Sequence, residues 1–104
     1  MKKVYNKLVR DKIPEIIKTA GKNAAVRIAD ESEYAHLLRQ KLVEEVDEFL
    51  ESNNPEELAD ILEVVISLGS LYDLSSAQLM KMAEEKRENR GGFEKRIVLV
   101  SVDG

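Results

Sequence analysis

The stretch that decides the fold is EEVDEFLESNNPEELAD, which runs from Glu44 to Asp60. Its first part continues a helical pattern of apolar residues, and the polar run Ser52-Asn53-Asn54 ends that helix. Pro55 and the two acidic residues after it are typical of a new helix, because proline fits the first turn and acids interact favourably with a helix N-terminus. Since the connection is short, we predict that the two helices form an antiparallel hairpin.

Two further helices are predicted outside the hairpin. A short one follows Lys12 and ends at Gly21, and a last one opens with a capping box from Ser75 to Gln78 and ends at Gly91. The valine-rich sequence from Phe93 onward has no helical period and is typical of a short strand or an extended tail. The sequence therefore predicts an all-α protein, a bundle of about four helices with a short extended C-terminal segment.

Length and composition limit the class of protein. The 104 residues are the size of one domain, which we place over residues 1–104. A net charge of -4 argues against binding to a nucleic-acid polymer, and the lack of cysteine excludes disulfides and thiol chemistry. No apolar run is long enough to span a membrane and no signal peptide is recognisable, so we expect a cytoplasmic protein without a membrane partner.

The charge pattern of the hairpin is unusual for solvated helices. Between Lys41 and Lys81 there is no lysine or arginine, and like charges one helical turn apart cost roughly 0.2–0.5 kcal/mol per pair. The same window holds ten acidic residues: Glu44, Glu45, Asp47, Glu48, Glu51, Glu56, Glu57, Asp60, Glu63 and Asp73. Such a run requires a counter-charge from elsewhere.

A bound divalent cation is one source of that charge. Residues three apart share a helix face, so Glu45 lies beside Glu48, and Glu57 lies beside Asp60. If the hairpin brings the two pairs together, four carboxylates offer the hard oxygen ligands that Mg²⁺ or Mn²⁺ prefers. The alternative is a plain acidic surface, which explains Glu57 near a helix N-terminus but not the acidic residues late in the preceding helix.

Basic residues lie towards the two ends of the chain. Lys86 and Arg90 are four apart on the last helix, where they either complement the helix dipole or bind the phosphates of an anionic ligand. Lys7 and Arg10 lie in the basic N-terminal segment. The spacing alone leaves both readings of Lys86 and Arg90 open.

Together these residues resemble the MazG-like all-α nucleoside triphosphate pyrophosphohydrolase family. The resemblance rests on YNKLVRDKIP at residues 5–14, on EExxE at residues 44–48, on ExxD at residues 57–60, and on Lys86 followed by Arg90-Gly91-Gly92-Phe93. It extends over nearly the whole chain and points to the phosphoribosyl-ATP pyrophosphohydrolase-like branch. One departure is the spacing of the acidic motifs, since only eight residues separate Glu48 from Glu57, fewer than is usual in MazG proper.

The resemblance implies a reaction and a role for each motif. Mg²⁺, with Mn²⁺ as an alternative, would support attack of water on the α-phosphorus of a nucleoside triphosphate, which releases pyrophosphate and the monophosphate. The implied metal ligands are Glu45, Glu48, Glu57 and Asp60; the implied catalytic group is Glu44, Glu45 and Glu48; the implied phosphate-binding residues are Lys86, Arg90, Lys7 and Arg10. Glu44 is open between ligand, base and bystander.

The resemblance also implies assembly, as a homodimer or homotetramer. This agrees with the hairpin's second helix, which is apolar on almost every side between Ile61 and Leu68 and has to be covered by neighbours. The favoured function is clearance of non-standard or excess nucleotides. The alternatives are phosphoribosyl-ATP hydrolysis in histidine synthesis and a non-catalytic helical dimerisation or regulatory module.

Overall fold

A computed structural model describes residues 3–104 and contains four helices in this part of the chain. They are α1 (Ile13–Thr19), α2 (Glu31–Ser52), α3 (Glu56–Ser70) and α4 (Ser76–Arg90). The prediction of an all-α protein is confirmed, because none of the described residues forms a strand and the chain after Gly92 is irregular. Over residues 3–104, no helix combines the length and the apolar character needed to cross a membrane.

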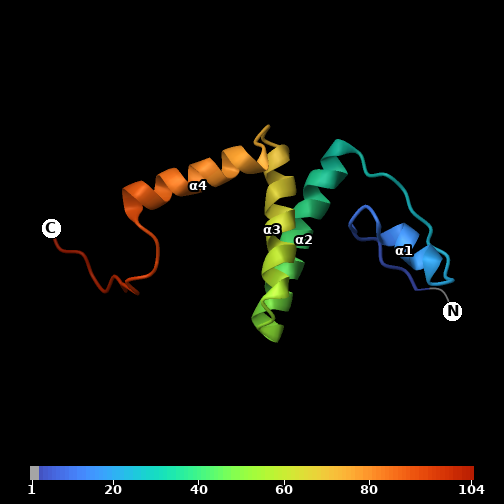
Figure 1. The fold of residues 1–104 in the computed structure, drawn as a ribbon, viewed down its shortest axis with the longest axis horizontal. Coiled ribbons are helices and arrows are strands. Elements are labelled where there is room, and N and C mark those ends of the chain that lie inside the picture. Colours follow the sequence, from blue (N-terminus) through green and yellow to red (C-terminus); the bar gives the residue numbers. More distant parts are fainter. Residues whose placement is uncertain (1–2) are drawn as a thin grey trace.

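Helices α2 and α3 form the hairpin that the sequence predicts, and they lie side by side at the centre of the molecule (Figure 1). Asn53 ends α2 in the left-handed conformation, with φ 54°, which asparagine tolerates better than most residues. The backbone N–H of Glu56 then donates to the side chain of Asn54 at 3.1 Å, which caps the start of α3. Leu38 on α2 and Val64 on α3 are the buried apolar side chains among the described residues.

Helix α4 begins at a tight corner after α3. A Cβ atom on Gly69 would lie 3.4 Å from the side chain of Leu79 and 3.5 Å from the backbone oxygen of Leu74, so it would just touch both and little room is left at this corner for a larger side chain. The predicted capping box is present: Gln78 N–H donates to Ser75 Oγ at 3.1 Å, and Ser75 N–H donates to Gln78 Oε1 at 2.8 Å. From this corner α4 points away from the hairpin (Figure 1).

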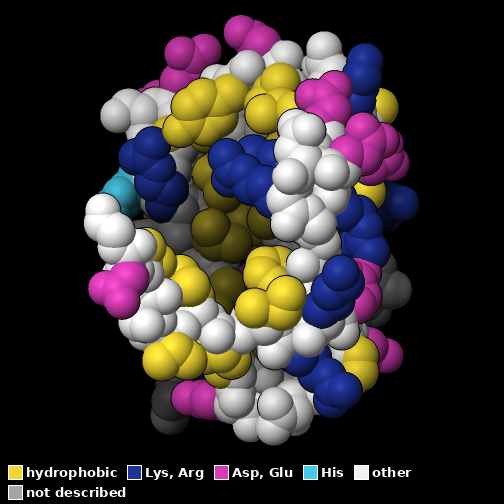
Figure 2. Space-filling view, turned by 90° about the vertical axis from the view of Figure 1, so that its left-hand side faces the viewer, with side chains coloured by type: hydrophobic (Ala, Val, Ile, Leu, Met, Phe, Trp, Pro, Cys, Tyr) yellow, Lys and Arg dark blue, Asp and Glu magenta, His cyan; other side chains and the backbone are white. Residues whose placement is uncertain are grey.

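The described chain is much more open than a compact domain of its length. Its radius of gyration is 18.4 Å, whereas about 13 Å is typical of a compact domain of 100 residues. Hydrophobic side chains lie open to solvent between basic ones, and also on the floor of a hollow (Figure 2). The uncovered apolar residues of the three longer helices include Val43, Leu50, Leu58, Leu62, Met80 and Met82.

Candidate metal centre

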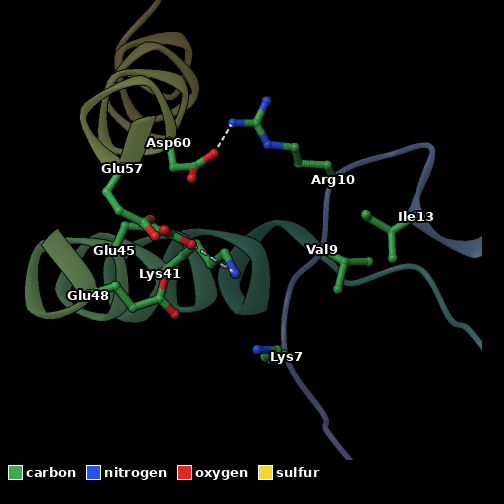
Figure 3. A pocket seen from close by; sticks show the side chains of 9 residues that line it. All are labelled: Lys7, Val9, Arg10, Ile13, Lys41, Glu45, Glu48, Glu57 and Asp60. Atoms are coloured by element: carbon green, nitrogen blue, oxygen red, sulfur yellow. Dashed lines mark hydrogen bonds and ion pairs between the residues drawn. The ribbon is translucent and has the colours of Figure 1, made fainter. Parts of the chain in front are cut away.

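A pocket lies where the irregular N-terminal segment, residues 3–12, passes the α2–α3 hairpin (Figure 3). Its volume is about 290 Å³. Acidic side chains from both helices form one wall, and basic and apolar side chains from the N-terminal part of the chain form the other. The lining residues are Lys7, Val9, Arg10, Ile13, Lys41, Glu45, Glu48, Glu57 and Asp60.

The carboxylates meet in two overlapping groups. Glu44, Glu45 and Glu48 each place a carboxylate oxygen within 4.8 Å of the others, and so do Glu45, Glu57 and Asp60. Glu45 belongs to both groups and is only 7% exposed, although a glutamate is rarely buried without a partner. The i,i+3 spacing within each helix and the short turn between the helices together produce this convergence.

Three side-chain cations neutralise part of the acidic cluster, which we define as Glu44, Glu45, Glu48, Glu57 and Asp60. Lys41 Nζ lies 3.3 Å from Glu45 Oε1 and 3.6 Å from Glu44 Oε2. The other two come from the N-terminal segment: Lys7 Nζ donates to Glu44 at 3.1 Å, and Arg10 Nη2 donates to Asp60 at 2.6 Å. Five carboxylates against three cations leave a formal excess of two negative charges.

The carboxylates that lack a cationic partner are the ones that hold protons more tightly. The charge of Glu45 raises the pKa of Glu48, and partial desolvation followed by the charge of Glu48 raises the pKa of Glu57. Burial acts upward on the pKa of Glu44, but the hydrogen bond from Lys7 and the charge of Lys41 outweigh it, so this pKa is lowered. The hydrogen bond to Glu44 raises the pKa of Lys7.

The structure brings most of the sequence-predicted site residues together. The implied metal ligands, Glu44, Lys7 and Arg10 all lie at one pocket or in direct contact with it. Lys86 and Arg90 do not line this pocket, because α4 carries them away from the hairpin (Figure 1), and their phosphate-binding role stays a prediction.

Lys41 is the site residue that the sequence analysis missed. There it only marked the edge of the window without basic residues. The signal was available, since Lys41 precedes Glu44 by three residues and Glu45 by four, the spacings at which helical side chains meet.

The donor set fits a hard divalent cation. It consists of carboxylate oxygens from two helices, it carries an excess of two negative charges, and its carboxylates repel one another. Comparisons of the chain with protein-family models, with curated proteins and with solved structures gave no match.

Proposed function

We propose that the chain is a Mg²⁺-dependent nucleotide pyrophosphohydrolase of the MazG-like type, which hydrolyses a nucleoside triphosphate or a related nucleotide to the monophosphate and pyrophosphate. One observation carries the proposal: carboxylates from α2 and α3 converge with a net negative excess, while Lys7 and Arg10 stand at the same pocket. This pairs ligands for a hard cation with donors for phosphate oxygens. Clearance of nucleotides in the cytoplasm is the cellular role in keeping with this reaction.

The acidic and the basic residues of the pocket would have different roles in this reaction. When bound, the metal would polarise the phosphate and lower the pKa of a bound water. Glu45, Glu57 and Asp60 would hold it. Glu48 would take the proton of the attacking water, because its carboxylate is the exposed member of the first carboxylate group and lies within 4.8 Å of Glu45. Lys7 and Arg10 would bind phosphate oxygens, and Glu44 would position Lys41.

A second copy of the chain would complete the fold. The support is the open shape of the described chain and the apolar side chains left exposed on both helices of the hairpin, among them Leu58 and Leu62, four residues apart on α3. Homodimer and homotetramer both cover such a surface. Assembly would also decide where Lys86 and Arg90 of α4 lie relative to the acidic cluster.

The test is a panel of nucleoside triphosphates, with phosphoribosyl-ATP among the substrates, assayed with Mg²⁺ for pyrophosphate and orthophosphate separately. We expect pyrophosphate and a monophosphate, and preferred turnover of phosphoribosyl-ATP would identify the histidine-synthesis alternative. Orthophosphate as the sole product would contradict attack at the α-phosphorus. Absence of turnover for every nucleotide would leave the non-catalytic helical module, in which the acidic cluster only forms ion pairs.

A pair of matched variants tests whether turnover requires the carboxylates of the pocket or only the overall negative charge of the hairpin. Asp60→Ala should abolish the metal-dependent turnover while the helical circular dichroism stays that of the wild type. Glu63→Ala removes an exposed carboxylate of α3 outside the acidic cluster and should retain activity. Equal activity of the two variants would refute the assignment of the pocket.

A further inference from the structure

Two cationic side chains of the N-terminal segment reach the acidic cluster and connect this segment to both helices of the hairpin. Lys7 pairs with Glu44 of α2, and Arg10 pairs with Asp60 of α3, fifty residues further along the chain. In Figure 3 both side chains lie on the N-terminal side of the pocket, and that of Arg10 reaches the α3 carboxylate. Arg10 thus engages a proposed metal ligand, and Lys7 engages Glu44, which lies beside the proposed ligand Glu45.

The connection between the segment and the hairpin is a weak one. The segment has no regular secondary structure, and α1, which follows it, has no helix–helix contact with α2, α3 or α4. The side chains of Lys7 and Arg10 are 44% and 54% exposed, so water competes for both ion pairs. Exposed pairs of this kind change an equilibrium by about 1.4- to 5-fold. A stronger cation can therefore replace them.

Asp60 cannot serve Arg10 and a divalent cation equally well. The guanidinium donates to Asp60 Oδ1 at 2.6 Å, and a metal on the same carboxylate would place two cations next to each other. A weaker repulsion acts on Lys7, because its partner Glu44 belongs to the same carboxylate group as the proposed ligand Glu45. A phosphate removes the conflict, because its oxygens can bind the metal and a guanidinium at the same time.

We propose that Lys7 and Arg10 are internal counter-ions which a divalent metal displaces from the acidic cluster, and which then bind the phosphate that arrives with the metal. The proposal rests on the proposed function, since it uses the same acidic cluster. Metal alone binds against the competition of Arg10, whereas metal with phosphate gains Arg10 as a donor. Metal and phosphate therefore raise each other's affinity, and the coupling is reciprocal.

The experiment measures metal binding by the full chain and needs no turnover. Mn²⁺ binding is followed by electron paramagnetic resonance of the free ion, first alone and then as the complex with inorganic pyrophosphate. Arg10→Gln should bind Mn²⁺ alone about 1.4- to 5-fold more tightly than the wild type, because the competitor is gone. The same variant should bind the Mn²⁺–pyrophosphate complex less tightly than the wild type does. Arg39→Gln, an exposed arginine of α2 outside the pocket, is the matched control and should change neither affinity.

Proteolysis of the wild type supplies a second measurement that does not depend on a variant. Mn²⁺ alone should accelerate tryptic cleavage after Lys7 and Arg10, because the released segment is more accessible, and pyrophosphate added with Mn²⁺ should slow it again. A wild type that binds Mn²⁺, combined with an unchanged or weaker affinity in Arg10→Gln, would overturn this inference and leave the metal site standing. Failure of both proteins to bind Mn²⁺ would overturn the proposed function as well.

Discussion

Lys41 offers the sharpest test of how the acidic cluster is balanced, through the substitution Lys41→Met, which keeps the aliphatic stem and removes the ammonium. The side chains of Lys41 and Glu45 are 19% and 9% exposed, with 3.3 Å between Nζ and Oε1. The cost of losing this ion pair lies between about 0.2–1 kcal/mol for an exposed pair and about 3–5 kcal/mol for a buried pair that loses one partner. We expect a loss of about 2 kcal/mol of unfolding free energy in EDTA, which lowers the Tm by about 8–16 °C in a domain of this size.

Mn²⁺ should then restore more stability to Lys41→Met than to the wild type, because the metal replaces the missing charge without a competing ammonium. At a concentration of 100 times its Kd, a ligand that binds only the folded state contributes about 2.7 kcal/mol, so both effects are measurable in thermal melts with EDTA and with Mn²⁺. Lys81→Met on α4, outside the pocket, is the control and should match the wild type in both conditions. A Lys41→Met protein with wild-type Tm in EDTA, or with no greater gain from Mn²⁺, would refute the charge balance described above.

Three other substitutions test the acidic cluster, the fold and the uncovered surface. The charge of Glu45 raises the pKa of Glu48, so the stability of the folded state falls as pH rises through that raised pKa. In EDTA, Glu48→Gln should therefore melt higher than the wild type at neutral pH and at the same temperature below the ordinary glutamate pKa of about 4.3. A lower melting temperature of the variant at neutral pH would contradict this. Gly69→Val adds branched carbons at a position where even a Cβ atom would lie 3.4 Å from the side chain of Leu79, and it should cost about 1–3 kcal/mol in thermal melts and speed hydrogen exchange in α4. Unchanged exchange would show that the corner is not tight. Leu62→Lys puts a charge on the uncovered face of α3 and should lower the mass measured by sedimentation equilibrium. An unchanged mass would exclude that face from the proposed interface.

The sequence predicted the local parts of the fold because their signals are local. The turn at Asn53, the capping box at Ser75 and the apolar spacing of α2 all act within a few residues, and each appears in the structure as expected. The convergence of the acidic cluster followed from two further local facts, the i,i+3 spacing and the short hairpin connection.

Features that join distant or weakly patterned segments were beyond the sequence. Nothing in the spacing showed that Lys7 and Arg10 meet residues 37 and 50 positions away, because ion pairs between an irregular segment and a helix leave no periodic signal. The direction of α4 was equally undetermined, since its apolar residues lie only in its first half and none of them is buried, so no packing face is indicated. The predicted assembly, which would use the uncovered surface, stays a prediction.

The hairpin also has a consequence for the order of folding. All the proposed metal ligands lie between Glu45 and Asp60, on two adjacent helices joined by a short connection. The contacts that bring them together therefore join residues that are close in sequence. Proteins rich in such local contacts fold on the microsecond-to-millisecond scale, faster than those dominated by distant pairings. We therefore expect the ligand set to assemble early in folding, before Lys7 and Arg10 join it, because their ion pairs close loops of 37 and 50 residues.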